Sequence, residues 1–319
     1  MLLVEQAAPA PGDSGVVMGN TATGARVDAT VIVAFEHGLR NLPAVMRSLD
    51  PVKWPTVEFF LCSAAPDDVE ILRGWSAQNV HPLQSPAGSR IPQLWRDGIL
   101  AARGPRLGIL SAHCVPDQDW VAALLAAPID NRCVGVGGCF SNSPDSDGAG
   151  WAIFLQRYIG YSRPLNAART GNIAADNAVY SRAAVLSCAD LLKNGFWELA
   201  FHRRFFAAGG HLQLSAALRV QHRNVYTPPQ FIRQRYDHGI QFGGERRRQF
   251  GRLRRTAMIM LSPAIPVVLY GRVIFRSWRY GWAFRIPLAA YGWLAVFAAA
   301  WGAGEVRGLL RPDHAGTIT

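Results

Sequence analysis

Polar side chains follow four strand-like apolar runs early in the chain, where an α/β protein binds its ligands. The four groups are Phe35-Glu36-His37, Ser63 with Asp67 and Asp68, Gly88-Ser89-Arg90 ahead of a helix that carries Asp97, and Ser111-Ala112-His113-Cys114. The carboxyl ends of parallel strands meet at one edge of a sheet, so these residues are expected to converge on one crevice. Each group alone is typical of a solvated turn, whereas four in register favour a site. Arg90 suits a phosphate there.

Other familiar kinds of site are not indicated. The sequence contains no glycine motif of the P-loop or dinucleotide type. Its five cysteines are an odd number and include no C-x-x-C spacing, which argues against a disulfide framework or a zinc cluster and favours a reducing compartment.

Strands and helices alternate from Arg26 to about Asn224. Buried strands are expected over 29–35, 57–63 and 106–112, and amphipathic helices over 41–50, 66–78 and 91–104. This order predicts an open, mostly parallel α/β sheet flanked by helices.

Positive charge is concentrated in the last third of the chain. Residues 219–285 hold 14 arginines, no lysine and two carboxylates, a net charge of +12 against +11 for the whole protein. An anionic partner is therefore expected, and the candidates are anionic lipids and nucleic acid. Nucleic acid is disfavoured because helix-turn-helix spacing, zinc-finger ligands and RNP aromatics are absent.

Two uncharged apolar runs adjoin the arginines. Thr256–Gly271 has 16 residues and two prolines, and Ile286–Gly304 has 19. Crossing the hydrocarbon core takes about 20 residues, so the second run is expected to span a membrane and the first to span, re-enter or lie in the interface. The alternative is a buried amphipathic helix pair. Clustered arginines before the first run predict a cytoplasmic face with anionic lipids, although three arginines in the connector leave the hairpin topology open.

Several segments, in order, resemble the family 2 nucleotide-sugar glycosyltransferases, which have the GT-A fold. The resemblance covers Val27 to about Gly251. Its segments are VIVAFEHGLRNLPAVMRSL, SRIPQLWRDGILAARGPRLGILSAHCVPDQDW, DNAVYSRAAV, FWELAFHRRFFAAGGHLQL, VQHRN and QFIRQRY.

The resemblance implies a nucleotide-sugar donor bound at the strand ends. The donor-binding residues would be Ala34, Phe35, Glu36, Ser63, Arg90, Asp97, Ser111 and Ala112. It also implies Mg²⁺ or Mn²⁺ across the diphosphate, with His113 and His222 as the candidate ligands. Imidazole suits Mn²⁺ better than Mg²⁺. A lone histidine at a strand end is otherwise typical of a hydrogen-bonded structural residue.

The resemblance further implies an acceptor side and a catalytic base. Asp176, Asn177 and Trp197 would lie on the acceptor side. Glu198 aligns with the catalytic base of an inverting displacement, and without the alignment it is equally a carboxylate stabilised by a helix N-terminus. Arg233 and Arg235 would stabilise the diphosphate or contact a membrane surface.

The chain departs from the family in both acidic motifs. The acidic pair after the second strand is Cys62-Ser63, and the Asp-x-Asp metal motif is Ser111-Ala112-His113. Hydrogen bonds to the nucleotide base must therefore come from other residues or be weaker, and His113 is the one metal ligand left in the motif.

The leading hypothesis is a membrane-attached bacterial-type glycosyltransferase at the cytoplasmic face of the inner membrane, with a lipid-linked or cell-envelope acceptor. Alternatives are a non-catalytic, membrane-anchored GT-A scaffold that binds a nucleotide or a partner, and an arginine-rich membrane-binding or nucleic-acid-binding protein with an incidental α/β domain.

The expected organisation is a disordered tail (1–25), a GT-A-like domain (26–225), a basic juxtamembrane segment (226–255), two apolar membrane segments (256–304) and a C-terminal tail (305–319).

Overall fold

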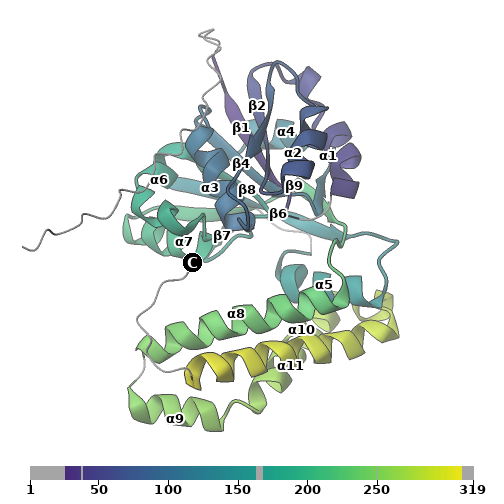
Figure 1. The fold of residues 1–319 in the computed structure, drawn as a ribbon, viewed down its shortest axis with the longest axis vertical. Coiled ribbons are helices and arrows are strands. Elements are labelled where there is room, and N and C mark those ends of the chain that lie inside the picture. The colour runs from purple at the N-terminus through teal and green to yellow at the C-terminus, as the bar shows by residue number, and fades with distance from the viewer. Residues whose placement is uncertain (1–25, 37–38, 163–167, 250, 311–319) are drawn as a thin grey trace, which may run out of the picture.

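The structure, a computed structural model, describes residues 26–36, 39–162, 168–249 and 251–310. A curled sheet flanked by helices forms one part, and the last four α-helices of the described chain form a layer beside it (Figure 1). The expected tails at 1–25 and 311–319 lie outside the described residues. The tail expected from residue 305 is corrected at its start, because helix α11 (Leu288–Leu310) continues to Leu310.

The described strands form a single mixed sheet in the order β3-β2-β1-β4-β8-β6-β9-β5, with β7 paired to β9. The strands are β1 (Ala29–Ala34), β2 (Val57–Ser63), β3 (Val80–Gln84), β4 (Arg106–Ser111), β5 (Cys114–Pro116), β6 (Cys133–Asn142), β7 (Ala168–Thr170), β8 (Asn177–Ser181) and β9 (His211–His222). Strands β3, β2, β1 and β4 are parallel, as expected. The prediction of a mostly parallel sheet is wrong beyond β4, because β8 is antiparallel to β4 and to β6, and β5 and β7 are antiparallel to β9.

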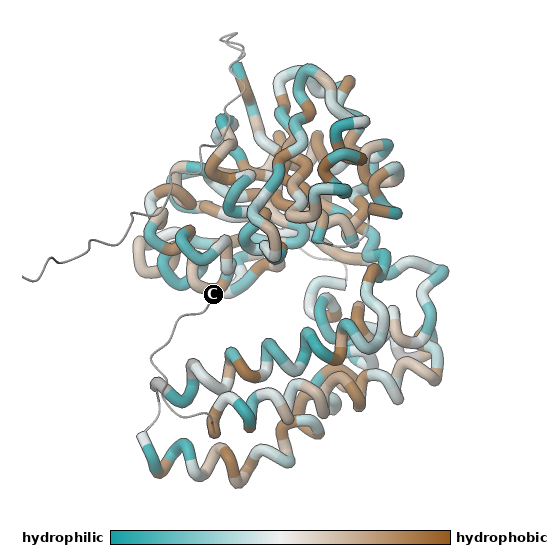
Figure 2. The backbone as a smooth tube through the Cα atoms, viewed as in Figure 1, coloured by the Kyte–Doolittle hydropathy of each residue, from teal (hydrophilic) through white to brown (hydrophobic). Residues whose placement is uncertain are grey.

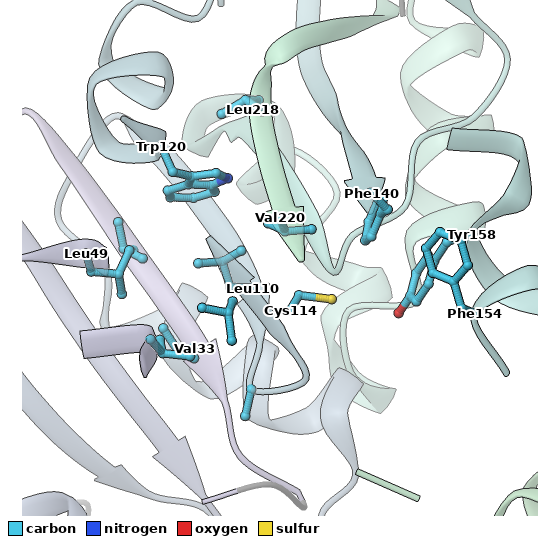
Figure 3. Packing of buried hydrophobic residues seen from close by; sticks show 14 of the residues in the cluster. Val33, Leu49, Leu110, Cys114, Trp120, Phe140, Phe154, Tyr158, Leu218 and Val220 are labelled. Carbon is cyan, nitrogen blue, oxygen red and sulfur yellow. The ribbon is translucent and has the colours of Figure 1, made fainter. Parts of the chain in front are cut away.

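Helices cover both faces of the sheet because its central strands are apolar on both sides. The helices of the α/β part are α1 (Leu42–Leu49), α2 (Pro66–Arg73), α3 (Ile91–Ala101), α4 (Trp120–Leu125), α5 (Gly148–Tyr158), α6 (Arg182–Leu186) and α7 (Glu198–Ala207). All of β1 and β2 is buried. One core joins the sheet to α1, α4 and α5, and a second joins it to α3 and α7. In the first core the rings of Phe140 and Tyr158 stack 4.2 Å apart (Figure 3).

The helical layer consists of α8 (Pro228–Gln249), α9 (Arg252–Met260), α10 (Ala264–Arg279) and α11. Glycines let α8 and α11 approach closely. A Cβ at Gly243 would lie 2.2 Å from the Glu305 carbonyl oxygen, and one at Gly304 would lie 2.1 Å from that of Tyr236. The carboxylate of Glu305, which is buried in this interface, pairs with Arg246 at 2.6 Å. Backbone contact and a partly buried ion pair therefore join the two helices.

The span expected over Ile286–Gly304 is not found. Among the described residues no single helix is long and apolar enough to cross a membrane. The pair α9 and α10 passes that test only together and is bent by 67° at its break. The run in α11 instead packs on α8 and α5, where Phe297 meets Phe231 with ring centroids 4.8 Å apart. Helix α9 changes from hydrophilic at its arginine-rich start to hydrophobic at its end (Figure 2).

Candidate active site

A cavity of about 560 Å³ lies between the first turns of α8 and the beginnings of α3 and α7, and Glu36, which follows β1, also lines it. Six of the predicted site residues line it: Glu36, Arg90, Asp176, Trp197, Glu198 and Arg233. Its other polar or aromatic lining residues, which sequence reasoning missed, are Trp95, Arg157, Tyr226, Gln230, Gln234, Asp237 and His238. Of the four groups expected to converge on one crevice, two reach this cavity, through Glu36 and Arg90, whereas the groups at Ser63 and at Ser111 do not line it. Helices α5 and α8 supply much of the rest of the lining.

Glu198 is positioned by a tight contact between two helix beginnings. Gly195 has a φ of +104°, and a Cβ there would lie 2.8 Å from the backbone of Pro92 in α3. The backbone N–H of Phe196 donates to the Pro92 carbonyl at 2.7 Å. Only glycine combines this backbone conformation with such close approach, so the chain enters α7 with Glu198 at the cavity wall.

The environment of Glu198 favours its protonated form. Burial raises its pKa from 4.5 to about 7, and the nearby charge of Asp176 acts in the same direction. A carboxyl group with a pKa near neutrality can take up a proton and release it at physiological pH. Beside it, the indole N–H of Trp197 donates to the Asn194 carbonyl at 2.9 Å.

Asp176 lies at the centre of a buried hydrogen-bond network. Its Oδ1 accepts from the Ser111 hydroxyl and lies 3.3 Å from His113 Nε2. Its Oδ2 accepts from the Tyr158 hydroxyl at 2.8 Å and from the Arg157 guanidinium at 3.1 Å. Burial alone would raise the pKa of Asp176, but the charge of Arg157 and the hydrogen bonds from His113 and Ser111 keep it well below its usual range. Asp176, predicted for the acceptor side, thus joins the end of β4 to α5.

Arg157 is the cation of this network. Its guanidinium lies 5.1 Å from the ring centroid of Tyr158 and 5.9 Å from that of Tyr226. Its second terminal nitrogen is buried and has no hydrogen-bond partner among the described residues. The sequence did not single out Arg157, because a lone arginine near the end of an amphipathic helix is ordinary.

The two arginines predicted for the diphosphate lie on different sides of α8. Arg233 lines the cavity and pairs with Asp237 at 3.2 Å. Arg235 does not line the cavity, which corrects that prediction. Its guanidinium lies over the rings of Phe231 and Trp301 and is 2.9 Å from His238 Nδ1. Burial lowers its pKa to about 9. Two residues along a helix are about 200° apart, so the pair cannot share a face.

Several predicted donor-binding residues are core residues instead. Ala34, Phe35, Ser111 and Ala112 are buried and do not line the cavity. The Ala112 N–H donates to the Ala34 carbonyl at 2.9 Å, which places their backbone within the sheet.

Three more predicted residues form local contacts away from the cavity. Ser63 donates to Asp68 at 3.0 Å, and Asp97 pairs with Arg96 at 2.7 Å. The Asn177 amide accepts from Trp120 at 2.8 Å and donates to the Cys139 and Leu218 carbonyls. Asn177 therefore ties strands together, and the acceptor role expected for it is not supported.

The predicted metal ligands are brought together but do not form a ligand set. The rings of His113 and His222 lie 5.7 Å apart, and His113 Nε2 is 2.9 Å from the Tyr158 hydroxyl. His222 Nδ1 is 3.4 Å from the Asn142 side-chain oxygen. Within the described ranges no group of three or more His, Cys, Asp or Glu side chains could hold a metal ion. The nearest carboxylate, Asp176, already accepts at both oxygens, so the residues present do not fit Mg²⁺ or Mn²⁺.

Comparison with known proteins identifies the fold. No protein-family model matches the chain, and no curated protein sequence does. The chain is similar to the mannosyltransferase PcManGT from Pyrobaculum calidifontis, solved with GDP-Man and Mn²⁺, at 15% identity and a TM-score of 0.52 over 89% of this chain and 88% of that one. GalNAc-T7, solved with UDP, GalNAc and Mn²⁺, has 16% identity and a TM-score of 0.48 over 66% of this chain and 47% of that one, which is too weak to argue from. The mixed α/β sheet with its flanking helices is therefore a GT-A-type fold.

Proposed function

We propose that this chain transfers a sugar from a nucleoside-diphosphate donor to an acceptor hydroxyl with inversion, as family 2 enzymes do. The observation that carries the proposal is Glu198, a carboxyl group with a pKa of about 7 on the wall of a 560 Å³ cavity. The cavity lies where an α/β fold binds its ligands. Arg90, Arg157 and Arg233 line the same cavity and suit a diphosphate. The fold shared with a mannosyltransferase solved with GDP-Man agrees with this class of donor.

In the proposed reaction Glu198 is the general base. The acceptor oxygen bonds to the anomeric carbon from the face opposite the diphosphate while the bond to the diphosphate oxygen breaks. The proton of the acceptor hydroxyl passes to the Glu198 carboxylate, and the diphosphate leaves with the bonding electron pair. Arginines of the wall stabilise the negative charge that develops on the leaving group.

We further propose that the acceptor is lipid-linked and that the protein lies at the cytoplasmic face of a membrane. Helix α8 forms part of the cavity wall and belongs to the helical layer. In that layer α9, α10 and the turn between them expose large apolar side chains, namely Leu253, Met260, Leu261, Val267, Val268, Phe275 and Trp278. Three arginines, Arg252, Arg254 and Arg255, lie in the first turn of α9. An amphipathic pair with this composition suits an anionic membrane interface, and it would place the cavity close to a lipid-borne acceptor.

Nucleotide binding and donor turnover test the enzymatic proposal. Isothermal titration of the full chain with UDP, GDP and dTDP is expected to show binding of one of them. Its sugar donors are then assayed for transfer or hydrolysis. Glu198→Gln is expected to abolish transfer and to leave nucleotide affinity unchanged. Retained turnover in that variant would rule out Glu198 as the base.

A second candidate is a non-catalytic GT-A scaffold that binds a nucleotide or a partner. The observation that favours it is the carboxylate-free end of β4, where Ser111 and His113 contact Asp176 and no metal ligand set forms. Transfer or hydrolysis of any nucleotide sugar would exclude this candidate. Binding of a nucleotide without turnover of any of its sugar donors would favour it.

A further inference from the structure

Arg157 of α5 lies beside the end of β4, joined to it through Asp176, where the family 2 enzymes that this sequence resembles would bind a metal. The negative charge of a leaving diphosphate has to be neutralised, by a metal ion or by protein cations. The described residues offer no ligand set for a metal. They do offer Arg157, whose side chain lines the cavity.

Asp176 forms an ion pair with Arg157, as a metal-binding carboxylate would with a bound metal ion. It accepts from Arg157 at 3.1 Å, and its other partners are Ser111, His113 and Tyr158. Two of these, Ser111 and His113, come from the positions that correspond to the acidic metal motif. With both its oxygens engaged, Asp176 holds the guanidinium in place and has little capacity left for an added cation.

Arg157 retains unused hydrogen-bonding capacity, and its side chain lines the cavity. One terminal nitrogen donates to Asp176, and the other is buried without a hydrogen-bond partner among the described residues. A buried donor left without a partner is costly, and a phosphate oxygen would satisfy it with a strong, charge-assisted bond. The rings of Tyr158 and Tyr226 lie close to the guanidinium and restrict its movement.

We propose that Arg157, held by Asp176, takes the charge-neutralising place of a divalent metal, so that the nucleoside diphosphate binds without one. Arg90 and Arg233 line the same cavity and are available for the remaining phosphate oxygens. The inference rests on the proposed function and names the group that stabilises the leaving diphosphate.

The test measures binding of UDP, GDP, dTDP and inorganic pyrophosphate to the full chain by titration calorimetry, in excess EDTA and then with Mn²⁺. We expect the dissociation constant of the bound ligand to agree within about twofold in the two conditions. Arg157→Gln is expected to weaken binding about tenfold or more, as for loss of a charged hydrogen bond. Because that variant removes the arginine partner of Asp176, Arg157→Gln with Asp176→Asn removes both charges and is expected to weaken binding similarly.

A matched control separates this effect from general charge loss. Arg219 is exposed and pairs with Asp117 at 3.4 Å, outside the cavity, and Arg219→Gln is expected to bind like the unmodified chain. Binding that requires Mn²⁺, or unchanged affinity in both Arg157 variants, would overturn the inference and leave the proposed function standing. Failure of all four ligands to bind with or without metal would overturn the proposed function and the inference together.

Discussion

Replacing the proposed catalytic base is expected to stabilise the protein at alkaline pH. The folded state raises the pKa of Glu198 from 4.5 to about 7. A tenfold change in an ionisation equilibrium corresponds to about 1.4 kcal/mol, so keeping the ionised carboxylate in the folded protein costs about 3 kcal/mol. The neutral amide of Glu198→Gln has nearly the same shape and does not incur this cost.

The direction of the pH dependence follows from the sign of the shift. Because the folded-state pKa lies above the unfolded one, Glu198 contributes stability that is fully present below about pH 4.5 and is lost as pH rises through about 7. The variant is therefore expected to match the unmodified chain near pH 4.5 and to exceed its free energy of unfolding by about 3 kcal/mol near pH 8.

Urea unfolding of both proteins between about pH 5 and pH 8 measures this difference, since other titrating groups are common to both chains. Glu70→Gln is the matched control, because Glu70 and its partner Arg73 on α2 are both exposed and such pairs contribute less than about 1 kcal/mol. A difference between Glu198→Gln and the unmodified chain that does not change with pH would refute the reasoning. It would also remove the main support for Glu198 as a base at neutral pH.

Three further predictions concern activity, packing and membrane contact. In an assay of transfer, kcat/KM is expected to fall about tenfold per pH unit below pH 7 and to level off above it, because the Glu198 pKa is about 7; a profile flat down to pH 5 would contradict this. Gly243→Ala places a methyl group 2.2 Å from a carbonyl oxygen of α11 and is expected to cost about 1–3 kcal/mol in thermal unfolding. Gly244→Ala, with nothing within 4 Å, is expected to gain up to about 1 kcal/mol from helix propensity, and equal effects would argue against the close α8–α11 contact. In flotation with phosphatidylglycerol vesicles, Trp278→Ser is expected to weaken association about tenfold through lost apolar burial, whereas Ile71→Ser on α2, also exposed, is expected to have no effect; equal loss in both would count against the membrane proposal.

The local elements and part of the cavity wall could be predicted from sequence. Strands β1, β2 and β4 begin as predicted and end within one residue of the prediction, because short apolar runs bounded by turns specify a buried strand locally. Glu198 is predicted from the segment FWELAFHRRFFAAGGHLQL, in which Arg204 and Gly209 align it with the catalytic base of the family that the sequence resembles. The structure places it at the cavity. The positions at strand ends followed from the alternation of strands and helices.

Tertiary structure decided which of these residues meet and what they meet. Ser111 and Asp176 are 65 positions apart yet hydrogen-bonded, and neither residue carries a local indication of the other. Arg157 and Arg235 show the same limit, since only the packing of α5 and α8 places the first at the cavity and the second against Trp301. The apolar run in α11 could be read as a membrane span because hydropathy records only that a segment avoids water. The glycine-lined face of α8 takes up part of this run, and that contact appears only in the packed helices.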